Sequence, residues 1–148
     1  NILKQRGLTV GTAESCTGGY LAHMITRVPG SSAYFRGSVV AYANEIKEKE
    51  LDIDPQMLAT HGAVSEETVS AMAQGVCQKL GVDIGLATSG IAGPDGGTAE
   101  KPVGTIWIAV AYQGQVETRL LKLFKDRELN IKMTAISTLA MLWRILTK

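Results

Sequence analysis

The sequence predicts an α/β protein: a three-layer α/β/α sandwich around a mixed, mostly parallel sheet with one late antiparallel hairpin. Short runs of β-branched and aliphatic residues alternate with segments of helical periodicity, which is typical of strands joined by covering helices. Near the C-terminal end two such runs are separated only by Gln113-Gly114, a pair that favours a tight hairpin turn. At 148 residues, the chain has the length of one domain, which we expect to span residues 1–148.

The N-terminal part of the chain predicts two strands, each followed by a helix. The first strand is expected over Leu8–Ala13 and the first helix over Cys16–Val28, ending at Pro29-Gly30. Apolar residues of this helix recur at the spacing of one helical face: Leu21, Met24, Ile25 and Val28. A second strand is expected over Arg36–Ala43, leading into a short polar helix over Asn44–Leu51.

The remainder of the chain predicts further helices and three strands. Asp54-Pro55 opens a short turn or helix, and a longer helix is expected from an N-cap at Ser65 to Gly81. The strands are expected over Asp83–Thr88, Val103–Ala111 and Gln115–Phe124. Asp126 is expected to cap a final helix. The inward-facing residues of that helix are predicted to be Ile131, Ala135, Ile136, Leu139, Trp143 and Leu146.

Charge and composition argue against several classes of protein. Fifteen basic and fourteen acidic residues form no basic stripe of the kind that binds nucleic acid. No apolar run approaches the ~20 residues of a membrane-spanning helix, and no signal peptide is recognised. The two cysteines, Cys16 and Cys77, lack metal-binding spacing, and no other metal motif is present. We therefore expect a cytoplasmic protein that binds no nucleic acid, membrane or metal.

Two segments rich in small residues follow predicted strands. One covers residues 12–19; the other begins at Ser89 and holds four glycines and a proline within nine residues. Such glycine density permits close backbone approach, or an anion cradle of N–H groups. A long surface loop accounts for the same composition. Because sites in α/β sheets form beyond the carboxyl ends of strands, both segments are candidates.

Ser15 is a candidate nucleophile in the first of these segments. Free N–H groups at a helix start can hold an oxyanion, although serine is also a common N-cap there. Cys16 competes for the role, because a thiol at a helix N-terminus has a lowered pKa. A histidine base is hard to supply, since only His23 and His61 exist and neither is well placed. A lysine of lowered pKa is the alternative base, yet Lys47 alone, in a run of alternating charge, favours a surface position.

These motifs together resemble the C-terminal domain of the CinA family of competence/damage-inducible proteins, in particular its stand-alone nicotinamide-nucleotide amidohydrolases. The likeness extends from about Leu8 to the final helix. It is carried by Ala13–Gly19, Tyr42-Ala43-Asn44 with Lys47, Ser89–Gly97, and Lys101–Thr105. The resemblance implies a three-layer α/β/α domain with a mixed sheet.

The resemblance also implies an activity: metal-independent hydrolysis of nicotinamide mononucleotide to nicotinic acid mononucleotide and ammonia. Ser15 matches the nucleophile, Lys47 the general base, and Tyr42 a residue that relays or stabilises the proton. The implied substrate-binding residues are Cys16, Thr17, Gly18, Asn44, Ser89, Gly90, Gly93, Gly96, Gly97 and Thr98. The Gly-rich loop would surround the phosphate or shape the pocket for the pyridine ring, and Lys101 and Arg127 are candidate phosphate partners.

The expected partner is therefore a small nucleotide substrate. No cofactor is expected, and a homo-oligomer is compatible with the sequence. The alternative is a catalytically silent nucleotide-binding or interaction domain of a competence/damage-inducible protein, which would keep the fold and the Gly-rich loop.

Overall fold

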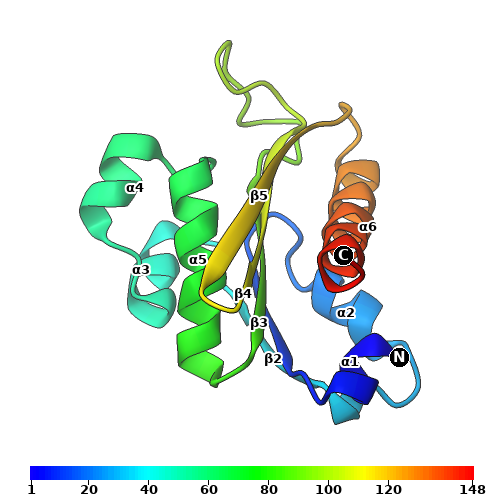
Figure 1. The fold of residues 1–148 in the computed structure, drawn as a ribbon. Helices are drawn as coiled ribbons and strands as arrows, with labels where there is room; N and C mark the ends of the chain where they lie inside the picture. The colour runs from blue at the N-terminus through cyan, green and yellow to red at the C-terminus, as the bar shows by residue number, and fades with distance from the viewer.

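A five-stranded sheet between two layers of helices forms the framework of the protein (Figure 1). The computed structural model describes residues 1–148. The strands are β1 (Val10–Glu14), β2 (Phe35–Val40), β3 (Ile84–Gly90), β4 (Thr105–Tyr112) and β5 (Gln115–Lys122). The helices are α1 (Ile2–Arg6), α2 (Tyr20–Thr26), α3 (Asn44–Leu51), α4 (Pro55–His61), α5 (Glu66–Leu80) and α6 (Arg127–Leu146), with a 3₁₀ turn η1 (Ser31–Ala33).

The strand order is β2-β1-β3-β4-β5. β1 pairs in parallel with β2 and β3, whereas β4 is antiparallel to both β3 and β5. Only β4 therefore runs against the other strands, which confirms the predicted mixed sheet with a late hairpin. The carboxyl ends of β1, β2 and β3 meet at one edge of the sheet, where the segments after Glu14, Val40 and Gly90 come together.

Each face of the sheet has its own apolar core. On one face α5 packs against β3 and β4, with α3 and α4 outside it; on the other lie α2 and α6 (Figure 1). The contact of α5 with β3 is close enough to require glycine at position 85. A Cβ built there would lie 2.2 Å from the carbonyl oxygen of Ala73. None of the helices combines the length and the hydrophobicity that a membrane span requires.

The expected caps are confirmed, but one helix starts later than predicted. Ser65 Oγ accepts from the N–H of Thr68, and the Asp126 carboxylate accepts from that of Leu129. The helix expected from Cys16 begins at Tyr20, because a turn precedes it in which Gly18 and Gly19 have positive φ. Ser15 therefore lies in this turn and not in the helix.

The inward face predicted for α6 is partly wrong. Ile136 and Trp143 are 47% and 62% exposed, while the buried positions include Asn130, Thr134 and Thr138. The threonines are buried at low cost because each hydroxyl donates to a carbonyl one turn earlier; Thr134 Oγ1, for example, lies 2.6 Å from Asn130 O. Apolar periodicity alone cannot identify a buried face of this kind.

Candidate functional site

A small pocket of about 230 Å³ opens at the carboxyl ends of β1, β2 and β3. It brings together residues from several distant parts of the chain. Its lining residues are Ser15, Cys16, Tyr42, Asn44, Lys47, Ala63, Val64, Ser89, Gly90, Ala92 and Arg127. All three predicted catalytic residues are among them.

Ser15 and Lys47 form a buried pair in the lining of this pocket. Lys47 Nζ lies 3.1 Å from Ser15 Oγ and 3.1 Å from the carbonyl oxygen of Tyr42, to which it donates. The lysine is only 1% exposed and has no carboxylate partner within ion-pair distance. Burial therefore lowers its pKa below the usual value of 10.5. A neutral amine beside a serine hydroxyl can accept the hydroxyl proton.

The surface position that the charge pattern favoured for Lys47 is wrong. The acidic and basic residues around it do lie on the outer side of α3, but Lys47 itself is among the most buried large side chains of the protein. The buried side of α3 contains only Lys47 and Leu51. A helix this polar gives no periodic signal that separates its inner lysine from its outer ones.

Cys16 does not have the lowered pKa expected of a thiol at a helix start. Its side chain is 6% exposed and belongs to the apolar core, and burial raises its pKa to about 12. The thiol is therefore protonated at neutral pH and a poor nucleophile. The backbone N–H groups of Cys16 and Thr17 donate to no other residue of the protein, so they are candidate donors to an oxyanion beside Ser15.

Glu14 holds the turn that carries Ser15, a role that the sequence analysis missed. Its carboxylate is fully buried and accepts from the N–H groups of Gly19, Leu21 and Ala22 at the start of α2. It also accepts from three side-chain hydroxyls, those of Thr12, Thr17 and Ser38. The only sequence signal was an acidic residue shortly before a helix, where the helix dipole favours negative charge.

Replacing Glu14 with glutamine is expected to lower the free energy of unfolding by about 3 kcal/mol, since charge-assisted bonds are lost and an NH₂ group faces donors. Urea denaturation measures the change. Glu100→Gln, at an exposed loop position, is the matched control and should change stability by less than ~0.5 kcal/mol. Equal stability of the two variants would contradict this role for Glu14.

The Tyr42 hydroxyl does not make the contacts that the predicted role in proton relay requires. Its side chain is 59% exposed, and its hydroxyl accepts from Arg127 Nη2 at 3.2 Å. No hydrogen bond joins this hydroxyl to Ser15 or Lys47; the contact to Lys47 is through the Tyr42 carbonyl. Asn44 does not cap α3, since Ala43 is the N-cap, and its amide makes no hydrogen bond within the protein.

The Gly-rich segment divides between the pocket and the surface. Ser89 and Gly90 line the pocket, with Ser89 Oγ donating to Ala63 O at 2.8 Å, and Gly93 O accepts from Arg127 Nη1 at 2.7 Å. Farther along, the loop surrounds a separate hollow of about 570 Å³ beside Lys125. Three predicted binding residues line this second hollow and not the first: Gly96, Gly97 and Thr98.

Two other predicted binding residues are engaged in the turn after β1. Thr17 Oγ1 donates to Glu14 at 2.6 Å and lies 2.8 Å from Thr88 Oγ1, while Gly18 has φ +57° and is exposed. Neither lines the pocket. Lys101, considered as a phosphate partner, instead donates from Nζ to His61 O at 3.1 Å and ties the loop to α4.

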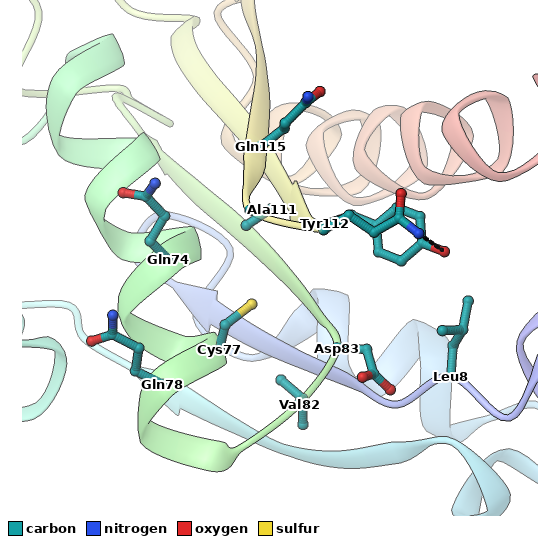
Figure 2. A pocket seen from close by; sticks show the side chains of 11 residues that line it. Leu8, Gln74, Cys77, Gln78, Val82, Asp83, Ala111, Tyr112 and Gln115 are labelled. Carbon is teal, nitrogen blue, oxygen red and sulfur yellow. Dashed lines mark hydrogen bonds between the residues drawn. The ribbon is translucent and has the colours of Figure 1, made fainter.

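A larger hollow, of about 620 Å³, lies at the opposite end of the sheet. Figure 2 shows Gln74, Cys77 and Gln78 of α5 on one side of it and Tyr112 and Gln115 of the β4–β5 hairpin on the other. Burial raises the pKa of the Cys77 thiol, and no lysine, arginine or histidine lines this hollow. It therefore lacks the lysine beside a nucleophile that the smaller pocket has.

Comparison with known proteins identifies the family. The model of the CinA C-terminal domain matches residues 1–146. The chain belongs to the CinA family. A CinA-like protein of Cytophaga hutchinsonii is 57% identical over 143 residues, covering 97% of this chain and 34% of the relative. The chain thus spans about a third of the length of the curated relatives it matches.

Solved structures of CinA proteins have the same fold. A CinA superfamily protein from Klebsiella pneumoniae is 37% identical with a TM-score of 0.95, covering 99% of this chain and 91% of that one. A competence/damage-inducible protein from Agrobacterium tumefaciens gives the same identity and TM-score, covering 99% and 89%. The fold expected from the resemblance is therefore confirmed.

Proposed function

We propose that this CinA domain is a metal-independent amidohydrolase that converts nicotinamide mononucleotide to nicotinic acid mononucleotide and ammonia. The observation that carries the proposal is the buried Lys47 amine, 3.1 Å from Ser15 Oγ and without a carboxylate partner. The resemblance to nicotinamide-nucleotide amidohydrolases, which matches Ser15, Tyr42 and Lys47 residue by residue, supports the substrate.

In the first step Lys47 takes the proton of Ser15 while Oγ attacks the carboxamide carbon. The carbonyl oxygen becomes an oxyanion, and the unpaired N–H groups of Cys16 and Thr17 are the donors available to it. Collapse of this intermediate breaks the C–N bond. Lys47 returns the proton to the departing nitrogen, so ammonia leaves and an ester to Ser15 remains.

In the second step a water molecule gives its proton to Lys47 and attacks the ester carbon. The C–Oγ bond then breaks, Ser15 regains its proton from Lys47, and the carboxylic acid departs. Tyr42, with its exposed ring and its hydroxyl on Arg127, serves as a wall for the substrate, and Arg127 as a cation at the mouth of the pocket.

The direct test is ammonia release from nicotinamide mononucleotide with EDTA present, with the acid product identified by chromatography. The proposal expects turnover that EDTA leaves unchanged. The competing function, a catalytically silent nucleotide-binding domain, expects no ammonia above the blank but saturable binding of the nucleotide. The proximity of Lys47 to Ser15 favours the enzyme.

Nicotinamide riboside, which lacks the phosphate, is expected to be a much poorer substrate than the mononucleotide. The N–H groups of Asp95, Gly96 and Gly97 make no backbone hydrogen bond, and Lys125 lies beside them, so this loop can receive an anion. Losing contacts worth ~2–4 kcal/mol lowers kcat/KM by ~30- to 1,000-fold. Steady-state kinetics with both compounds measure the ratio of the two kcat/KM values. Equal values would contradict a phosphate-binding role for this loop.

A further inference from the structure

An exposed apolar stripe runs along α6 on the side opposite its buried face. Leu129, Ile136 and Trp143 are 40%, 47% and 62% exposed. They recur every seven residues, close to two helical turns, so they form one line along the helix. Apolar residues gathered in a line on a surface mark an interaction site, whereas single ones are normal.

The stripe ends at an apolar hollow. This hollow has a volume of about 240 Å³ and lies between α1 and the end of α6; six of its seven lining residues are hydrophobic, Trp143 among them. An exposed tryptophan beside an apolar hollow is the kind of anchor that dominates binding energy at protein interfaces.

The spacing of the stripe makes it complementary to itself. Leu129 and Trp143 are each seven residues from Ile136, on opposite sides along the helix. A two-fold axis at Ile136 therefore sets Ile136 against its own copy and Leu129 against Trp143 of the other copy. We propose that α6 is an isologous dimer contact, in which two copies of this chain pack their α6 helices antiparallel about Ile136.

One pair of charges beside the stripe fits the same arrangement. At about 100° per residue, Asp126 and Arg144 both lie about 80° from Ile136 on the same side of α6. In the antiparallel pair they come from different copies at heights of about 15 and 12 Å from the axis, so opposite charges meet. Neither residue forms an ion pair within its own chain, and a net charge of +1 opposes association little.

The contact is small. A 20-residue helix is about 30 Å long and 10 Å wide, less than the about 800 Å² per partner of a standard interface. The hollow beside Trp143 and α1 adds to it. We therefore expect a dimer that dissociates on dilution, with a Kd in the micromolar range.

Sedimentation velocity at protein concentrations from about 1 µM to 1 mM measures this dimer. The mass should rise from 15.8 kDa to twice that value. Trp143→Lys and Ile136→Lys should each weaken association at least ~100-fold. Leu120→Lys is the matched control: Leu120 is 38% exposed and pairs with Trp107 on the face of the sheet that α5 covers, so association should be unchanged.

Cross-linking tests the register. In a Cys77→Ser background, Ile136→Cys should form a disulfide between copies on mild oxidation, because the two Cβ atoms meet at the axis. Leu129→Cys should not cross-link alone but should do so when mixed with Trp143→Cys. A protein that stays monomeric at every concentration, or a dimer that survives both lysine variants, would overturn the proposal and leave the stripe to another partner.

Discussion

Replacing Ser15 with alanine is expected to lower kcat for nicotinamide mononucleotide at least ~100-fold, whereas replacing the adjacent Cys16 is expected to preserve most activity. The reason is the different chemistry of two neighbouring side chains. Ser15 Oγ lies 3.1 Å from a lysine amine, and loss of a nucleophile or an oxyanion donor costs at least this factor. The Cys16 thiol is buried with a pKa of about 12, and alanine keeps the backbone N–H that we assign to the oxyanion.

Ammonia release under saturating substrate measures both variants, and circular dichroism shows that each is folded. Cys16→Ala is the matched control for Ser15→Ala, because it removes one atom of similar size from the next residue. Activity that survives Ser15→Ala and disappears in Cys16→Ala would show that the nucleophile is misassigned.

Replacing Lys47 with methionine is expected to lower kcat by ~100- to 10,000-fold, the usual contribution of a general base. Methionine keeps the length of the buried side chain. Arginine would keep the positive charge, but its larger side chain does not suit position 47, which is only 1% exposed. Wild-type kcat should rise with pH through the lowered pKa of Lys47, with a midpoint below 10.5. Lys49→Met, at an exposed position of the same helix, should leave kcat and its pH profile unchanged.

Lys47→Met is also expected to change the pH dependence of thermal stability. Because the pKa of Lys47 is lowered on folding, the unfolded chain binds more protons between the folded value and 10.5, so wild-type stability rises with pH across that window. Below this pH window Lys47 is protonated in both states, and the full free-energy cost of burying its charge lowers the stability of the folded protein. Lys47→Met should therefore have a Tm at least as high as wild type at neutral pH, with a difference that shrinks toward pH 10.5. A Tm difference that does not vary with pH would contradict a lysine buried in its neutral form.

The fold followed from the sequence wherever local pattern and tertiary packing agree. The Gln113-Gly114 turn, the Ser65 and Asp126 caps and the order of strands and helices are all read from nearby residues, and the structure has each of them. The predicted inward position of Trp143 was wrong. Threonines occupy the inner face of α6 instead, because their hydroxyl groups donate to carbonyl oxygens of the same helix.

The candidate site could be predicted from the sequence less directly than the fold. Ser15, Tyr42 and Lys47 were linked by resemblance, and the pocket does contain all three. Lys47 is buried because α3 packs against α5. This packing cannot be predicted from the sequence of α3 alone. Glu14 was missed for a similar reason, since its six donors come from residues as far away as Ser38. The glycines of the Ser89–Thr98 segment also have a local role: a Cβ on Gly90 would lie 2.4 Å from Ile106.

The most direct measurement of the central claim is the location of the acyl group during turnover. Enzyme mixed with nicotinamide mononucleotide is quenched in acid and digested with trypsin, and the peptide that follows Arg6 and ends at Arg27 is fragmented by mass spectrometry. We predict an ester on Ser15 in the wild type, and none in Lys47→Met, which lacks the base. An adduct on Cys16, or on any residue of this peptide other than Ser15, would contradict the claim.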